Sequence, residues 1–176
     1  LIIQATLGCS HNACTFCSMY VDKRYEVRDL DELHQEIGLL SEMYPNTQRV
    51  FLADGDALGL PTDHLIKILE LLNKYFKNLR RVSIYASAGN LKAKRVEDLK
   101  KLKELKLTLV YFGIESGNDK LLKKIINGAG HDQIVKSLNK ASEAGLKTSV
   151  TVILGLGGKE RSHEHIEDSA KLINKV

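Results

Sequence analysis

The chain has 176 residues, 43% of them hydrophobic and 27% charged, with a formal net charge of +4. This balance is typical of a soluble globular protein, and the length suits a single domain with a buried core. No apolar run approaches the roughly 18 residues of a membrane span, and the N-terminus lacks the basic flank of a signal peptide, so we expect a cytoplasmic protein with no membrane contact. Because residue 1 is Leu and opens directly into an apparent strand, we expect residues 1–176 to be one domain cut from a longer chain.

Apolar runs of strand length alternate with amphipathic helical segments along the chain. The first expected strand is 1–7, and a cysteine loop follows at 8–20. A helix should begin near Asp29, which has capping-box spacing with Glu32, and end before Pro45. The later strands are expected at 49–53, 81–86, 107–114 and 147–154. The later helices are expected after Thr62 as the capping residue, at 91–106, at 119–126, at 132–144 with Gly145 as the C-terminal cap, and from Ser162 onward.

Periodicity also predicts which helical residues face the core. One apolar stripe consists of Leu65, Ile66, Leu69 and Leu72, and a second of Leu99, Leu102 and Leu105. Strand 107–114 is nearly all apolar, as expected of a strand that is covered on both faces. Positive charge gathers in 91–106, which we interpret as a solvated helix face, with RNA contact as the alternative.

Five consecutive strand–helix units predict an α/β fold with parallel strands and right-handed crossovers. Periodicity alone leaves both a barrel and an open doubly wound sheet possible. Cysteines, acidic residues and glycines recur just past the carboxyl ends of the first, second, fourth and fifth strands. In α/β folds this edge of the sheet binds ligands.

All three cysteines lie in one short segment, as Cys9-x4-Cys14-x2-Cys17. Three clustered thiols would leave one unpaired in any disulfide arrangement, so metal ligation explains them better. Structural zinc usually takes four Cys or His ligands, and iron–sulfur clusters of electron carriers take four cysteines. Three cysteines on a four-iron cluster would leave one iron open to a small molecule. We interpret His11 as a loop residue that packs or hydrogen-bonds near the cluster, with a role as fourth ligand as the alternative.

The cysteine loop resembles that of the radical S-adenosylmethionine (SAM) superfamily, where three cysteines follow the first strand of a partial βα barrel. Phe16 holds the aromatic position before the last cysteine, where the resemblance implies that it helps to cover the adenine of SAM. The first spacing here is four residues instead of the usual three, so the loop must bulge between Cys9 and Cys14. The resemblance implies a [4Fe–4S] cluster, SAM as cosubstrate, and a partial parallel barrel of about five βα units out of six. It is closest to the coproporphyrinogen-dehydrogenase and tRNA-modifying branch.

Two further motifs fall where the resemblance expects them. Asp54-Gly55-Asp56 follows the second strand, where the family carries a Gly-Gly-Glu segment that binds the methionine amino group; an acidic turn without a ligand is the alternative. Glu115 lies in Gly113-Ile114-Glu115-Ser116-Gly117, similar to a family element at the SAM site. A carboxylate after so many apolar residues is costly to bury without a partner. It could instead cap the next helix.

Weaker signals complete the expected cofactor site. By resemblance Ser87 faces the sugar, while Ile153 and Leu154 pack against the adenine beside the glycines at 155, 157 and 158. The segment is neither a Rossmann fingerprint nor a P-loop. The remaining histidines are interpreted as surface or packing residues; they are His34, His64, His131, His163 and His165.

The resemblance implies reductive cleavage of SAM to a 5′-deoxyadenosyl radical that abstracts hydrogen from an unidentified substrate. An external one-electron donor such as flavodoxin or ferredoxin would be needed. A non-catalytic zinc or iron–sulfur binding module is the main alternative, and a scaffold with merely redox-active cysteines is a third. Neither the substrate nor the oligomeric state is readable from the sequence.

Overall fold

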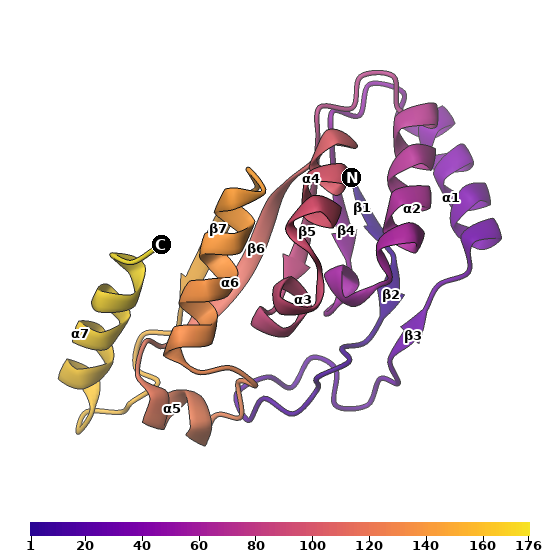
Figure 1. Ribbon diagram of the computed structural model, residues 1–176. Coiled ribbons are helices and arrows are strands. Elements are labelled where there is room, and N and C mark those ends of the chain that lie inside the picture. Colours follow the sequence, from indigo (N-terminus) through magenta and orange to yellow (C-terminus); the bar gives the residue numbers. More distant parts are fainter.

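The computed structural model describes all residues, 1–176, as a parallel sheet with a layer of helices (Figure 1). The sheet has five strands in the order β1-β4-β5-β6-β7. Their bounds are Ile2–Gln4 for β1, Arg49–Ala53 for β4, Arg81–Ala86 for β5, Leu107–Glu115 for β6 and Lys147–Val152 for β7. Every neighbouring pair is parallel. The expected α/β class and the parallel strand arrangement are therefore confirmed.

Strand order in the sheet follows chain order, which decides between the two topologies that the sequence left open. A doubly wound sheet reverses its strand order part-way and carries helices on both faces. Here each crossover advances by one strand in the same direction, and the helices lie on one side of the sheet (Figure 1). This is the arrangement of a partial βα barrel.

Seven α-helices accompany the strands. Their bounds are Leu30–Met43 for α1, Thr62–Tyr75 for α2, Ala88–Ala93 for α3, Val96–Glu104 for α4, Asp119–Lys124 for α5, His131–Glu143 for α6 and Ser162–Ile173 for α7. A short 3-10 turn, η1, spans Ala57–Gly59. The Asp29 side chain accepts hydrogen bonds from the backbone N–H groups of Asp31 and Glu32, so its predicted capping role is confirmed. Gly145 adopts a φ of +74°, as a C-terminal cap of α6 requires.

The expected first strand, 1–7, is in fact two strands. After Gln4 the chain leaves the main sheet, and β2 (Thr6–Leu7) pairs antiparallel with β3 (Glu26–Val27). This small ribbon joins the two ends of the cysteine loop. A two-residue strand carries no periodic signal, so sequence periodicity does not predict it.

The lysine-rich segment 91–106 is also not one helix. Lys94 has an extended backbone, with φ −88° and ψ 145°, and separates α3 from α4. Its side chain is buried and donates a hydrogen bond to the carbonyl oxygen of Leu60 at 2.6 Å. Burial lowers the pKa of this ammonium group. At least one lysine of the segment is therefore structural, and contact with RNA stays a prediction for the others.

Smaller differences concern single positions. Thr62 is the first helical residue of α2 and not its cap, which is Pro61. The buried stripe of α2 includes Ile68, whereas Ile66 is only partly buried. Leu105 likewise is partly buried beyond the end of α4. Strand β7 ends at Val152, so Leu154 lies outside it and is 81% exposed.

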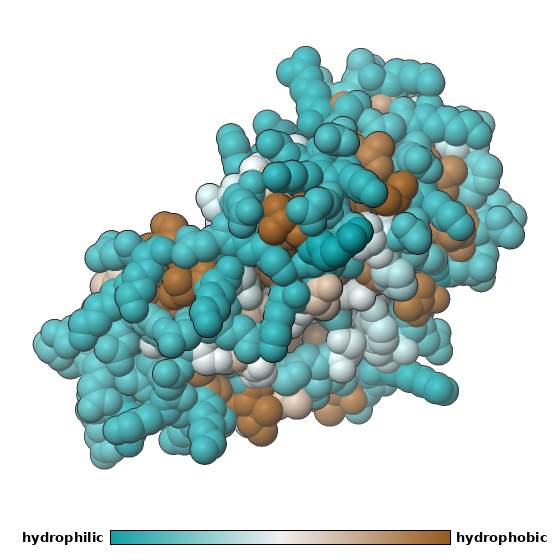
Figure 2. All heavy atoms as spheres, in the orientation of Figure 1, coloured by the Kyte–Doolittle hydropathy of each residue, from teal (hydrophilic) through white to brown (hydrophobic).

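The two faces of the sheet differ sharply. The register aligns Ile3, Leu52, Ile84 and Val110, all fully buried beneath the helices. The opposite face has no helix over it, and there Phe51, Tyr85 and Tyr111 form edge-to-face pairs with ring centroids 4.9–6.1 Å apart. The helical side of the molecule is largely hydrophilic, with scattered apolar spots (Figure 2). None of the helices is both long enough and apolar enough to cross a membrane.

Candidate functional site

The cysteine loop leaves the sheet at the carboxyl end of β1 and returns through β3. Gly8 begins it with a φ of +73°, and a Cβ at this position would lie 3.0 Å from the carbonyl oxygen of Arg24. Glycine is therefore required where the outgoing and returning chains meet. The loop runs along the lower edge of the sheet toward α5 (Figure 1).

The three cysteines of this loop are unpaired and half-buried. Burial, and then the nearness of Cys9 and Cys17, raises the pKa of the Cys14 thiol. No three His, Cys, Asp or Glu side chains are arranged to hold a single metal ion. Ligands of one zinc ion converge on a point, whereas each cysteine of a cubane binds a different iron.

Two hydrogen bonds fasten the loop to the segment after α5. The backbone N–H of Thr15 donates to the carbonyl oxygen of Ile125 at 3.0 Å. Nε2 of His11 lies 2.7 Å from the carbonyl oxygen of Ile126, so this nitrogen carries a proton. His11 is thus a loop-fixing residue through Nε2, in agreement with the reading that it hydrogen-bonds near the cluster.

Asp54 connects the segment after β4 to the cysteine loop. Its carboxylate accepts a hydrogen bond from the backbone N–H of Gly8 at 3.1 Å and another from the Tyr20 hydroxyl. Burial, followed by the bond to Asp54, raises the pKa of Tyr20. Asp54 therefore anchors the segment after β4 to the start of the cysteine loop, and its contact with SAM stays a prediction.

Gly55 and Asp56 continue this connection. A Cβ on Gly55 would lie 2.6 Å from the ring of Tyr20 and 2.9 Å from Cβ of Cys9, closer than real carbon atoms approach. Asp56 accepts a short hydrogen bond from the Ser10 hydroxyl and is largely buried. The acidic turn and the cysteine loop are therefore packed together, as the resemblance expects of a cluster beside the methionine end of SAM.

Glu115 ends β6 at the same edge, in a strained conformation. Its φ is +62°, and the N–H of Ser116 donates to the carbonyl oxygen of Ile114 at 2.7 Å, which makes a γ-turn centred on Glu115. Such turns with positive φ are rare and strained in non-glycine residues. The carboxylate lies over Gly113, in the space that a Cβ there would fill. Burial alone raises the pKa of Glu115.

The structure also shows what Glu115 does not do. The next helix, α5, is capped by Asn118, whose side chain accepts from the N–H of Leu121 at 3.1 Å. The alternative in which Glu115 caps that helix is therefore wrong. Its carboxylate is free to bind a ligand at the edge of the sheet.

The remaining predicted site residues have different surroundings. Ser87 caps α3 in a capping box with Asn90, so its oxygen is already used as an acceptor. Phe16 is 41% exposed on the cysteine loop. Ile153 is half-buried directly after β7, and its N–H donates to the carbonyl oxygen of Glu115 at 3.1 Å. Of this group, Ile153 has the closest link to Glu115, while the neighbouring Leu154 is exposed.

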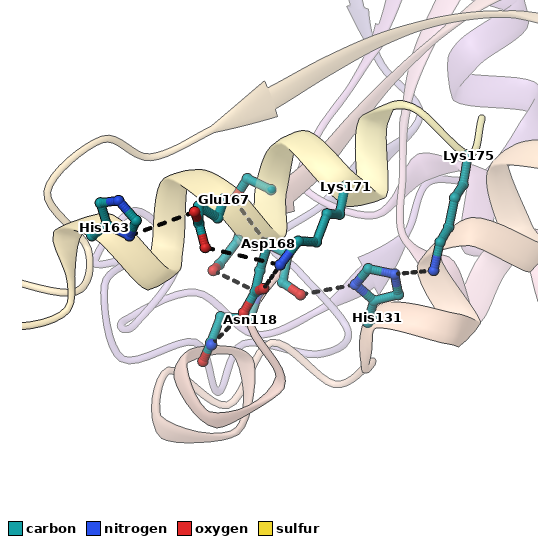
Figure 3. A network of polar contacts seen from close by, with 10 residues as sticks. Asn118, His131, His163, Glu167, Asp168, Lys171 and Lys175 are labelled. Atoms are coloured by element: carbon teal, nitrogen blue, oxygen red, sulfur yellow. Dashed lines mark hydrogen bonds and ion pairs between the residues drawn. The ribbon is translucent and has the colours of Figure 1, made fainter.

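Helix α7 is bound to the turn after β6 by a polar network that the sequence analysis missed (Figure 3). Asn118 donates to Asp168 at 2.7 Å, and the N–H of Gly117 donates to the Ser169 hydroxyl at 2.9 Å. The hydroxyl of Ser116 lies 2.8 Å from Nδ1 of the buried His165. Residue spacing was the one available indication, since His165, Ser169 and Leu172 share a helix face and this face is the buried one.

Residues 3–173 match the family model described as the radical SAM superfamily. The chain belongs to the radical SAM superfamily. Heme chaperone HemW from Bacillus subtilis is 28% identical over 170 residues, which cover 92% of this chain and 44% of HemW. The chain thus spans less than half the length of HemW.

Solved structures show the same fold at low identity. Cobalamin-dependent SAM radical enzyme OxsB, with aqua-cobalamin and SAM bound, has a TM-score of 0.77 at 17% identity over 98% of this chain and 26% of OxsB. Coproporphyrinogen III oxidase (HemN) from Escherichia coli has a TM-score of 0.73 at 19% identity over 97% of this chain and 41% of HemN. The predicted partial radical SAM barrel is thereby confirmed.

Radical SAM proteins use a [4Fe–4S] cluster and SAM, and the residues of this chain fit that pair. The donor set consists of the three thiols of one loop, and Gly55 provides a backbone position at which no side chain fits between the loop and the acidic turn. Glu115 adds a half-buried carboxylate with no partner inside the protein. The radical SAM assignment therefore agrees with the chemistry available at this edge.

Proposed function

We propose that this domain binds a [4Fe–4S] cluster through Cys9, Cys14 and Cys17 and cleaves SAM reductively. The observation that carries the proposal is the packing of a three-cysteine loop against the acidic turn Asp54–Asp56. When bound, the cluster supplies an electron to the SAM sulfonium, which gives methionine and a 5′-deoxyadenosyl radical that takes a hydrogen atom from the substrate. Because three thiolates serve four irons, one iron is left for SAM.

The protein residues supply binding and orientation. Asp56, whose carboxylate also accepts from Ser10, is the candidate to attract the ammonium group of methionine. Asp54 and Tyr20 fix the turn that carries it. Glu115 is the candidate acceptor for the ribose hydroxyls or the ammonium group, and Ile153 the candidate apolar contact for adenine. Ser87, Phe16 and Leu154 stay predicted SAM contacts.

The uncovered sheet face is the proposed side from which substrate approaches. Tyr85 and Tyr111 lie there with Phe51, and no helix of this chain covers them. A radical formed at the carboxyl edge of the strands would meet a substrate seated against this face. The identity of that substrate and the reaction completed on it are not proposed.

An external one-electron donor is part of the proposal, since the chain itself offers one cluster site. Flavodoxin and ferredoxin are the carrier classes that fit this need. The half-buried cysteines lie on a loop with exposed residues on either side, which gives a donor a short path to the cluster. A zinc module would need four converging ligands, and the match of residues 3–173 to the radical SAM family model favours the cluster instead.

The proposal is tested by anaerobic reconstitution with iron and sulfide, followed by addition of SAM and dithionite. We expect 5′-deoxyadenosine and methionine in equal amounts from the wild-type protein and none from Cys14→Ala. His11→Ala, which removes a loop hydrogen bond and no thiolate, is the matched control and should retain cleavage. Reconstituted protein that carries the cluster and leaves SAM intact would overturn the proposal.

A further inference from the structure

Glu115 and Ile153 are joined by a closed ring of bonds that runs through two buried polar side chains. The N–H of Ile153 donates to the carbonyl oxygen of Glu115 at 3.1 Å. Nε2 of His165 lies 2.9 Å from the carbonyl oxygen of Ile153, and Nδ1 lies 2.8 Å from the hydroxyl of Ser116. The peptide bond between Ser116 and Glu115 closes the ring.

Proton positions in this ring follow from the partners. A carbonyl oxygen only accepts, so Nε2 of His165 must donate to Ile153. In a neutral imidazole Nδ1 then accepts, and the Ser116 hydroxyl donates to it. The Ser116 oxygen in turn accepts from the N–H of Asn118 at 3.0 Å. With His165 neutral, the ring therefore admits a single arrangement of hydrogens.

The ring surrounds the strained residue of the site. A non-glycine residue with positive φ is strained and persists only where its surroundings hold it. Glu115 has a φ of +62° and is held on one side by Ile153 and on the other by Ser116. Ser116 and His165 are 0% and 1% exposed, so water does not compete for these bonds.

We infer that His165, acting with Ser116, is a positioning residue for the SAM site. It holds the γ-turn that directs the Glu115 carboxylate over Gly113, and it fixes the backbone of Ile153 on the other side of the same site. The inference rests on the proposed function, because it assumes that Glu115 and Ile153 contact SAM. It adds that α7, remote from the cysteines in sequence, sets the geometry of the ligand-binding edge.

If His165 only stabilised the fold, loss of another contact between α7 and the turn after β6 would affect SAM binding in the same way. Ser169 provides the comparison, since its buried hydroxyl accepts from the N–H of Gly117 at 2.9 Å and has no bond to Glu115 or Ile153. Loss of the His165 or the Ser169 side chain removes buried hydrogen bonds between α7 and the turn after β6. Only loss of His165 releases the ring around Glu115.

The test compares His165→Phe, His165→Gln and Ser169→Ala in reconstituted protein with the cluster intact. Phenylalanine fills the space without hydrogen bonds, whereas glutamine retains a donor and an acceptor. The Kd for SAM, measured without reductant, should rise at least about tenfold in His165→Phe and less in His165→Gln. Ser169→Ala should lower the melting temperature and leave the Kd within about twofold, because its bond lies outside the ring.

The outcomes separate the inference from the proposed function. Wild-type protein that binds SAM, with His165→Phe and Ser169→Ala changing the Kd by the same factor, would overturn the positioning role alone. Wild-type protein with a full iron complement that does not bind SAM would overturn the proposed function and this inference with it. Iron content and melting temperature of each variant, measured in parallel, identify any loss caused by unfolding.

Discussion

The carboxylate of Glu115 occupies the space above the α-carbon of Gly113, two residues earlier on the same strand. Successive residues of a strand point to opposite faces, so residues two apart share a face. The γ-turn at Glu115 folds its side chain back along that shared face. Absence of a side chain at 113 is what allows a half-buried carboxylate to lie at the edge of the sheet.

Gly113→Ala should therefore displace the Glu115 carboxylate. Overpacking of this kind costs about 1–3 kcal/mol, and we expect it to weaken SAM binding by about tenfold or more. Gly38→Ala is the matched control, because a Cβ there would meet only the Tyr75 ring at an ordinary 3.7 Å. Gly38 lies inside α1, so alanine should stabilise the fold by up to about 1 kcal/mol. Equal SAM affinity in wild type and Gly113→Ala would contradict this account of Glu115.

Glu115→Gln should make the protein more stable at neutral pH. Burial raises the pKa of Glu115 in the folded state, so the charged form is disfavoured there relative to the unfolded chain. The destabilisation is present above the folded-state pKa and disappears below the unfolded value of about 4.5. Denaturant unfolding of both proteins from pH 4 to 8 should show a gain for Glu115→Gln that grows with pH. A gain independent of pH would indicate another cause.

Gly55→Ala should impair cluster assembly. The added methyl group would meet the Tyr20 ring and Cβ of Cys9, and so must move the start of the cysteine loop. We expect less iron and sulfide per chain after reconstitution than in wild type. Gly89→Ala, whose new Cβ would lie 3.5 Å from the Ser87 hydroxyl, should reconstitute normally. Full iron content in Gly55→Ala would mean that the loop and the acidic turn can separate without loss of the cluster site.

The two faces of β5 should respond differently to truncation. Ile84 points into the helix-covered core and is fully buried, so Ile84→Ala should cost about 2–5 kcal/mol of unfolding free energy. Tyr85, the next residue, is 47% exposed on the uncovered face. Tyr85→Ala removes two edge-to-face contacts and should cost about 1–3 kcal/mol, less than Ile84→Ala. Similar losses at both positions would mean that the second face is covered in solution.

Much of this architecture follows from sequence periodicity. The alternation of apolar runs and helices predicted the parallel α/β fold, and β4, β5 and the limits of α1 agree with the structure. Predictions from local sequence patterns were wrong where contacts between distant residues determine the backbone conformation. Lys94 breaks a helix by turning inward to Leu60, and the ribbon of β2 and β3 forms because the ends of the cysteine loop meet.

The candidate site was predictable in part. The cysteine spacing and the acidic motifs predicted Cys9, Asp56 and Glu115 as site residues, because these residue types are costly to bury or reactive at strand ends. The anchoring role of Asp54 and the ring through Ser116 and His165 depend on partners 46–49 residues away. No local pattern encodes such a pairing, so only the fold reveals it.

The most direct test of the central claim is Mössbauer spectroscopy of the protein reconstituted with iron-57, before and after addition of SAM. The claim is that three cysteines hold four irons and leave one for SAM. It predicts that one iron in four changes its isomer shift and quadrupole splitting on SAM binding, while the other three stay as they were. Four irons that remain equivalent and unchanged at saturating SAM would contradict it.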